Sequence, residues 1–212
     1  MEEYITEIKE ISSKKVLVFI NDAPSFVLYK NEPEKLGIRT GEVIDSEKIE
    51  FIYDDVLYKR ALNRSLGLIR AKDHSTFEIK QKLCREYYPE EVVLNVINEL
   101  TDQGFLNDRR FAGTYISFYS SGKAPALMKM DLLKKGIDKD IIEDVLRSFE
   151  DEYPESEDEL IRKLLSHKYG NVTGFANDDE KYKFKSKVMA FLMRKGISYE
   201  KAAEGIKNHF DI

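Results

Sequence analysis

The chain carries one helical hairpin pattern more than once, and this repetition limits what it can fold into. Residues 132–146 read LLKKGIDKDIIEDVL, and residues 192–206 read LMRKGISYEKAAEGI. A weaker copy, LCREYYPEEVVLNVI, occupies residues 83–97. Self-similarity at intervals of tens of residues is typical of stacked supersecondary units. We therefore predict three copies of one helical unit.

Each of the two stronger copies encodes the end of one helix and the start of the next. The basic pairs 134–135 and 194–195 suit the negative end of a helix dipole. Gly136 or Gly196 follows and can adopt the left-handed conformation that ends a helix. Asp138 or Ser198 then offers a side-chain oxygen that can cap the following helix. The pattern predicts a tight helical hairpin, in which the glycines and caps have an architectural role.

The N-terminal residues show strand patterns instead. Residues 4–11, 16–20 and 26–29 are rich in β-branched and aromatic residues, and turn-forming residues separate them. These runs predict a three-stranded antiparallel meander, followed by one helical turn over 32–36 that Gly37 stops. Three short strands bury too little to be stable alone, so we expect them to pack on the helices that follow.

A helical period begins at residue 45 or 46 and continues to the C-terminus. Ser75 and Glu78 form a capping box, and Pro89 opens the next helix. Residues 150–159 read as an acidic connector, which is either a solvated linker or the negative first turn of a helix, where Ser156 and Glu159 would form another capping box. The third copy begins 60 residues after the second, against 49 for the first interval, and we assign the extra residues to the loop 170–174. The predicted domains are a β-rich extension and three three-helix repeats, at residues 1–45, 46–104, 105–150 and 151–212.

Composition indicates a soluble globular protein. Of the 212 residues, 34% are charged and 42% are hydrophobic, and no apolar run has the length of a membrane span. The N-terminus lacks the apolar core of a signal peptide. The single cysteine, Cys84, cannot form an internal disulfide. We expect a cytoplasmic protein without membrane attachment.

Motifs for catalysis are missing from the sequence. His74, His167 and His209 are dispersed, no paired cysteines could hold zinc, and no glycine-rich loop could hold a phosphate. We expect Cys84 to be a small packed apolar residue and not a nucleophile. The sequence therefore predicts a protein that is not an enzyme and needs no metal or cofactor.

Basic residues on the surface are the remaining candidates for function. The net charge is −5, but residues 105–149 hold 8 basic and 6 acidic residues and are the only net-basic part. Arg109 and Arg110 begin a helix, where the dipole disfavours them, so either a partner or local salt bridges, for example with Asp108 or another unit, keep them there. Alternate lysines from 181 to 187 are expected on two sides of one helix. Three aromatic residues could stack on bases, but we expect them in the core: Tyr115, Phe118 and Tyr119.

Three runs of residues resemble a known family. They are STFEIKQKL at 75–83, LTDQGFLNDRRFA at 100–112 and LKKGI at 133–137. Their order and spacing are similar to those of the RecX regulators of the bacterial RecA recombinase. The β-rich leader is similar to the longer members from Gram-positive bacteria.

This resemblance implies a fold and a partner. The fold would be mainly α-helical, with three tandem three-helix repeats forming an extended curved solenoid after a small antiparallel β meander. The partner would be the RecA filament on single-stranded DNA, bound by a monomer that suppresses ATP hydrolysis, strand exchange and coprotease activity. The protein would act in homologous recombination, in DNA repair and in the SOS response.

Exposed cations would supply the contacts to filament carboxylates or DNA phosphates. The predicted partner- and DNA-binding residues are Arg109, Arg110, Lys123, Lys134, Lys135, Lys181, Lys185, Arg194 and Lys195. One alternative is a sequence-independent DNA- or RNA-binding protein built from helix-turn-helix-like units. Another is a helical adaptor for a different protein.

Overall fold

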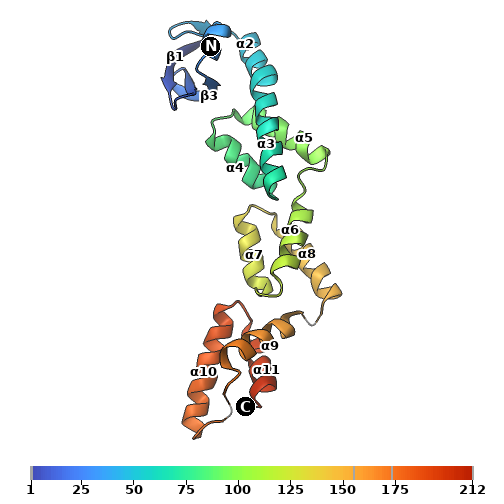
Figure 1. Ribbon diagram of the computed structural model, residues 1–212. Coiled ribbons are helices and arrows are strands. Elements are labelled where there is room, and N and C mark those ends of the chain that lie inside the picture. Colours follow the sequence, from blue (N-terminus) through green and yellow to red (C-terminus); the bar gives the residue numbers. More distant parts are fainter. Residues whose placement is uncertain (1, 155, 173, 212) are drawn as a thin grey trace. The chain divides into compact units, whose positions relative to one another are not determined.

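The fold is known from a computed structural model that describes residues 2–154, 156–172 and 174–211, with the side chain of Ser156 left out. The chain forms two compact units, residues 1–107 and 108–212, which are described separately here. Figure 1 shows strands only at the N-terminal end of the chain and helices in the later part. The mainly helical fold class predicted from the sequence is confirmed.

The N-terminal sheet has four strands. β1 (Glu3–Glu10), β2 (Lys15–Ile20) and β3 (Ala23–Tyr29) form the predicted antiparallel meander. Asn21 and Asp22 both have positive φ, 48° and 64°, as a tight hairpin turn requires. A fourth strand, β4 (Val43–Ile44), pairs with the start of β1, so the order is β3-β2-β1-β4. The sequence did not predict β4, because two residues are too few to show alternation.

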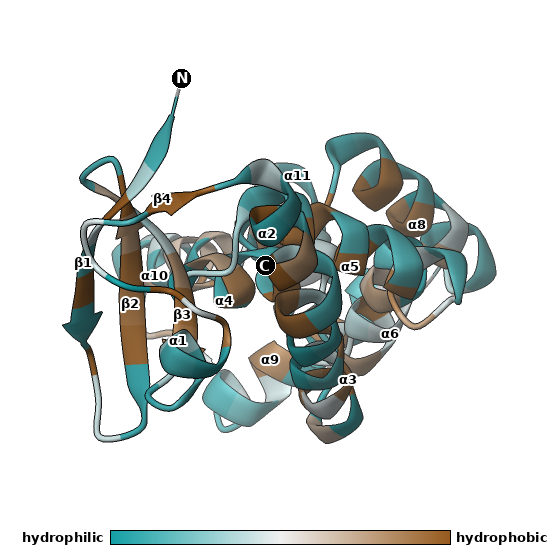
Figure 2. Ribbon diagram, turned by 90° about the horizontal axis from the view of Figure 1, so that it is seen from above, coloured by the Kyte–Doolittle hydropathy of each residue, from teal (hydrophilic) through white to brown (hydrophobic). Residues whose placement is uncertain are grey.

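The sheet and the following helices share one hydrophobic core. After α1 (Glu32–Lys35), a continuous helical stretch comprises α2 (Ser46–Phe51), a π-helical segment η1 (Ile52–Tyr58) and α3 (Lys59–Ala71). Figure 2 shows β2 as a largely hydrophobic strand, whereas the helices carry hydrophobic and hydrophilic residues in alternation. Phe26 of β3 is fully buried and meets Tyr53 of η1 edge to face at 6.0 Å. The predicted packing of the strands on the helices is confirmed.

An ion pair also ties the sheet region to this helix. Arg60 of α3 approaches Glu32 of α1 at 2.6 Å, and both side chains are about one-fifth exposed, at 19% and 22%. The guanidinium of Arg60 also lies 4.4 Å from the ring centroid of Tyr29, at the end of β3.

The remaining helices complete three sets of three. The first set joins α3 to α4 (Thr76–Arg85) and α5 (Glu90–Asp102). The second contains α6 (Asp108–Tyr119), α7 (Pro125–Lys134) and α8 (Lys139–Glu152). The third contains α9 (Ser156–Tyr169), α10 (Asp178–Arg194) and α11 (Tyr199–Phe210). The capping box of Ser75 and Glu78 is present, and Pro89 occupies the N-cap of α5, one residue before the first turn.

The middle helix of every set ends in the same backbone geometry. The N–H groups of Ile137 and Ile197 donate to the carbonyls five residues earlier, at Leu132 and Leu192, over 3.1 and 3.2 Å. Between these residues, Gly136 and Gly196 have φ of 74° and 86°. This is the hydrogen-bond pattern of a Schellman motif. Asp138 and Ser198 then cap α8 and α11, as predicted.

The weak first copy adopts this corner without a glycine. Tyr88 N–H donates to the Leu83 carbonyl over 3.2 Å, and Tyr87, in the position of the glycine, has φ of 60°. A left-handed conformation costs a non-glycine residue about 1–2 kcal/mol. The first copy is therefore a true structural repeat whose corner is strained.

One expectation about the connections is wrong, and for another the structure decides between two alternatives. Most of the extra length of the third repeat lies in α10, which has 17 residues where α7 has 10, and not in the loop at 170–174. Thr173 in that loop lies outside the described residues. The acidic run 150–159 is largely helical, because it supplies the end of α8 and the start of α9; Glu155 is not among the described residues. Acidic residues favour a helix N-terminus, so α9 can begin within the run.

Replacing Tyr87 tests the strained corner. Tyr87→Gly should raise the free energy of unfolding relative to Tyr87→Ala by about 1 kcal/mol, because glycine adopts a positive φ without steric cost. The alanine variant is the matched control, since both changes remove the same side chain, which is 45% exposed. Urea unfolding followed by circular dichroism measures the difference. An alanine variant as stable as the glycine variant would contradict the strain.

A second pair of substitutions separates backbone strain from packing. A Cβ added at Gly196 would lie 2.7 Å from Leu127 Cγ and 3.3 Å from Ala124 Cβ, whereas at Gly104 (φ 74°) it would meet nothing within 4 Å. We expect Gly104→Ala to cost about 1 kcal/mol for strain alone. Gly196→Ala should cost about 1–3 kcal/mol more, because it also overpacks the contact between the second and third repeats. Equal losses in urea unfolding would show that this contact is loose.

Candidate functional site

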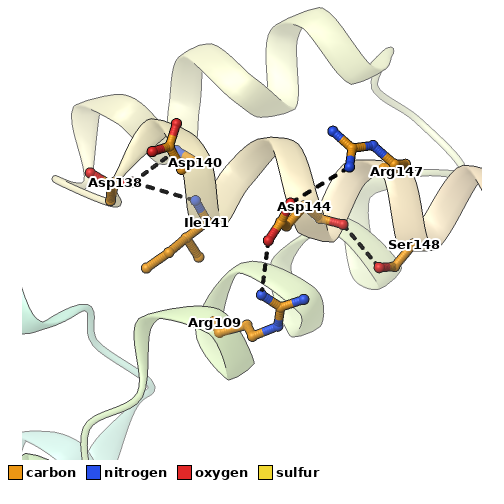
Figure 3. A network of polar contacts seen from close by, with 7 residues as sticks. All are labelled: Arg109, Asp138, Asp140, Ile141, Asp144, Arg147 and Ser148. Carbon is orange, nitrogen blue, oxygen red and sulfur yellow. Dashed lines mark hydrogen bonds and ion pairs between the residues drawn. The ribbon is translucent and has the colours of Figure 1, made fainter.

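Arg109 forms a local salt bridge, which is one of the two alternatives that the sequence left open for the arginines that begin α6. Arg109 Nη1 lies 3.4 Å from Oδ2 of Asp144 on α8, and Asp144 also approaches Arg147 at 3.8 Å (Figure 3). The side chains of Arg109 and Asp144 are 58% and 52% exposed, so the pair is a weak surface bridge. Arg109 therefore has a local partner within its own repeat, on α8, and retains exposed donors. Arg110 beside it is also exposed.

Lys123 belongs to an internal polar network. Its ammonium donates to Asp131 Oδ2 over 2.8 Å and to the Tyr115 hydroxyl over 2.9 Å, and that hydroxyl donates to the same Asp131 oxygen over 2.8 Å. The ammonium also lies 4.2 Å from the ring centroid of Tyr119. The network joins α6, the following loop and α7. The main role of Lys123 is therefore to hold these segments together.

The same network shifts the pKa values of its members. Hydrogen bonds from Lys123 and then Tyr115 lower the pKa of Asp131 below its usual range. Hydrogen bonds to Asp131 and Tyr115 raise the pKa of Lys123. Both shifts favour the charged forms, so the ion pair persists at neutral pH.

Two basic pairs occupy equivalent positions in the second and third repeats. Lys134 and Lys135 end α7, and Arg194 and Lys195 end α10. Lys134, Arg194 and Lys195 are exposed, whereas Lys135 is half-buried with its ammonium 5.6 Å from the ring centroid of Phe111. The repeated helix end therefore presents cations at the same structural position twice.

The lysines of α10 lie on two sides of the helix, as their spacing predicts. Lys181 and Lys185 are half-buried, whereas Lys183 and Lys187 are exposed. Lys183 pairs with Asp179 at 2.7 Å. Of the nine predicted binding residues, Lys195 lines a concavity that is rich in cations.

This concavity, the cationic groove, lies within residues 108–212 and has a volume of about 470 Å³. It is bounded by α9, the C-terminal part of α10 and Ser121 in the turn that follows α6. Its lining residues are Ser121, Leu160, Lys163, Leu164, His167, Lys168, Phe191 and Lys195. Sequence reasoning missed three of its cationic or titratable members on α9: Lys163, His167 and Lys168. Their spacing of four and five residues, which places them near one another on a helix, was the available signal.

The aromatic residues of α6 separate into buried and exposed members. Tyr115 packs against the core of the second repeat, as expected. Phe118 is 74% exposed and Tyr119 is 37% exposed, so the expectation that they belong to the core is wrong. Ala112 and Ile116 define the buried face of α6, and Phe118, two residues after Ile116, points away from it.

Cys84 is exposed, so the expectation that it is a packed apolar residue is also wrong. Cys84 follows the fully buried Leu83 on α4. Successive side chains of a helix point in different directions, so the side chain of Cys84 points out of the core. Within the ranges that the structure covers, no group of three or more His, Cys, Asp or Glu residues could hold a metal ion. Over the same ranges, no helix combines the length and the apolar character needed to traverse a bilayer.

Comparisons with known proteins assign the three helix sets. Models of the first, second and third three-helix domains of RecX match residues 61–100, 107–146 and 155–204. The chain belongs to the RecX family. All three domains are present, in the order of the family.

Relatives extend the match to the whole chain. It is 28% identical over 211 residues to the regulatory protein RecX of Clostridium acetobutylicum, covering 99% of this chain and 97% of that protein. It is also 28% identical to the regulatory protein RecX of Bacillus subtilis, covering 93% of this chain and 74% of that protein. These relatives are regulatory proteins by name.

Solved structures agree in fold. One crystal structure of a regulatory protein RecX has a TM-score of 0.62 at 24% identity and covers 97% of this chain and 99% of that chain. The crystal structure of RecX from Lactobacillus salivarius has a TM-score of 0.61 at 25% identity and covers 72% and 96%. The sheet and the three repeats therefore form a RecX fold. The basic pairs at 134–135 and 194–195 end the middle helices of the second and third RecX domains.

The Lys123 network predicts how the stability of the second RecX domain depends on pH. The pKa of Asp131 is lower in the folded protein than in the unfolded chain, where it is about 3.9. The ion pair therefore stabilises the fold fully above the unfolded pKa, and this stabilisation is lost as the pH falls through the lower pKa of the folded protein. Asp131→Asn should lower the free energy of unfolding by about 0.5–1 kcal/mol at pH 7, since the pair is one-third exposed. The loss should shrink below about pH 4.

Urea unfolding at pH 7, 5 and 3 measures this difference. Asp54→Asn is the matched control, because Asp54 is exposed and the described residues show no ion pair for it. If Asp131→Asn lowers the free energy of unfolding by the same amount at pH 7 and at pH 3, the ion pair is not the source of the loss.

Proposed function

We propose that this protein is a non-enzymatic regulator that binds the RecA filament on single-stranded DNA and inhibits its ATPase, recombinase and coprotease activities. The observation that carries the proposal is the succession of three RecX three-helix domains, shared with relatives named as regulatory proteins. We also propose that it acts as a cytoplasmic monomer, with repeats at residues 46–104, 105–150 and 151–212 after an extension at 1–45.

Repeated cationic helix ends support this proposal. A regulator built from repeats can touch several protomers of a filament, and linked weak contacts gain affinity together. Lys134 and Arg194 are exposed at equivalent helix ends and could each donate to a carboxylate or a phosphate. Arg109 and Arg110 add exposed guanidinium groups at the start of α6. Lys123 would contribute indirectly, because its ammonium is engaged by Asp131.

Turnover of ATP by RecA on single-stranded DNA tests the proposal. Purified protein added in amounts below those of RecA should reduce the turnover. The double reversal Lys134→Glu/Lys135→Glu should weaken inhibition by about tenfold, because repulsion replaces attraction at the partner surface. Lys183→Glu/Lys187→Glu is the matched control, since it changes the net charge equally at exposed positions on α10. Turnover that the wild-type protein leaves unchanged would refute the proposal.

A second candidate function is sequence-independent binding of DNA or RNA through the helix-turn-helix-like units. The exposed ring of Phe118 and the exposed cations favour it, because stacking and phosphate contacts require no sequence. This candidate predicts that labelled oligonucleotides bind without RecA and that affinity falls steeply with salt. Binding that appears only when RecA is present would exclude it as the main function.

A further inference from the structure

The cationic groove concentrates positive charge that the protein does not neutralise. Lys163, Lys168 and Lys195 line it together, and within the described residues none of the three forms an ion pair. Like charges around one concavity repel one another, so this arrangement reduces stability unless an anion enters. Helix dipoles account for part of it, because Lys168 lies in the last turn of α9 and Lys195 at the end of α10. They do not account for Lys163, which lies near the middle of α9.

The apolar wall of the groove narrows the class of anion. Leu160 and Phe191 are 2% and 8% exposed, and Leu164 beside them is half-buried. Apolar walls bind apolar groups by removing them from water, and they contribute nothing to holding a phosphate chain. The combination fits a ligand that carries both negative charge and an apolar side chain.

The aromatic ring in the groove argues against a nucleic-acid base as that apolar group. The ammonium of Lys168 lies 4.0 Å from the ring centroid of Phe191 and covers one face of the ring. Base stacking needs an open ring face, and single-strand binding grooves supply such faces in succession. Phe191 is only 8% exposed, so it offers no open ring face of the size that a base needs.

From this geometry we propose that the cationic groove binds a carboxylate-rich peptide segment of a protein partner, with one apolar side chain of that segment against Leu160, Leu164 and Phe191. The volume of about 470 Å³ is within the range of specific binding pockets and can hold one large side chain. Carboxylates on either side of that side chain would accept charge-assisted hydrogen bonds from Lys163 and Lys195. The neighbouring cavity shares Ser121, Leu160 and Lys163 with this groove and also contains Glu152 and Glu159, so the excess of positive charge is greatest on the side of Lys168 and Lys195.

This inference is argued from the groove alone. It adds to the proposed function a description of the surface that a protein partner would present. Its test therefore uses the full-length protein without RecA. The probe is a fluorescein-labelled peptide of aspartate and glutamate around a central leucine and phenylalanine, followed by fluorescence anisotropy. One control peptide replaces the two apolar residues with serine, and another replaces the carboxylates with amides. Both should bind at least about tenfold more weakly than the probe, because each lacks one of the two features that the groove recognises.

Charge reversal in the groove supplies the matched protein variants. Lys163→Glu/Lys195→Glu should weaken binding of the acidic peptide by at least about tenfold, because repulsion replaces two attractive contacts. Lys187→Glu, on the same helix as Lys195 but outside the groove, should leave affinity within about twofold. Thermal unfolding should show that the double variant still folds, with a somewhat lower Tm than the wild type, because Lys195→Glu places an anion at the negative end of α10.

The outcomes separate this inference from its rivals. Equal peptide affinity for the wild type and the double variant would overturn it, as would equal binding of the amide control peptide. If labelled oligothymidylate, and not the acidic peptide, loses affinity in the double variant, the groove is a nucleic-acid site and the proposal is wrong. A wild-type protein that binds the peptide but leaves RecA turnover unchanged would refute the proposed function alone.

Discussion

The helical part of this protein depends on one hydrogen bond made three times. In each repeat an amide N–H donates to the carbonyl five residues earlier and closes the middle helix, at Leu83, Leu132 and Leu192. The closure requires a left-handed residue just before the donor, and that residue sets the direction of the next helix. Two repeats supply glycine for it, whereas the first repeat uses Tyr87 and accepts the strain. Each bundle can bury its apolar faces only after the chain has turned at this corner.

The cations of the second and third repeats have different roles, which the neighbouring elements decide. Lys123 is held by Asp131 and Tyr115, and Arg109 meets Asp144, so these cations support the second repeat. Lys195 instead lines a groove with lysines from α9 that have no ion pair among the described residues. These cations also differ in position, since Arg109 lies in the first turn of α6, Lys123 in the loop after α6 and Lys195 at the end of α10. The presence of a carboxylate on the adjacent helix decides whether a lysine stabilises the fold or remains available to a partner.

Local rules explain which predictions the structure confirms. Caps, helix ends and hairpin turns depend on residues within about five positions of one another, so Asp138, Ser198 and the Ser75 capping box could be identified directly. β4 was missed because its two residues pair only through β1. The exposure of Cys84 and Phe118 was misjudged because each lies one or two residues after a buried residue of the same helix. Each step along a helix turns the side chain to a new direction, so residues this close in sequence can face the core and the solvent.

The sequence by itself determined the repeat and the corners, since both follow from patterns along the chain. It also placed cations at the helix ends. Only the tertiary structure decided which cations are paired and which line a concavity, because those properties depend on distances between helices that the sequence spacing does not contain. The cationic groove combines α9, α10 and Ser121 in the turn after α6, and Ser121 and Lys195 are far apart in the chain. Packing of the second repeat on the third brings them to one site.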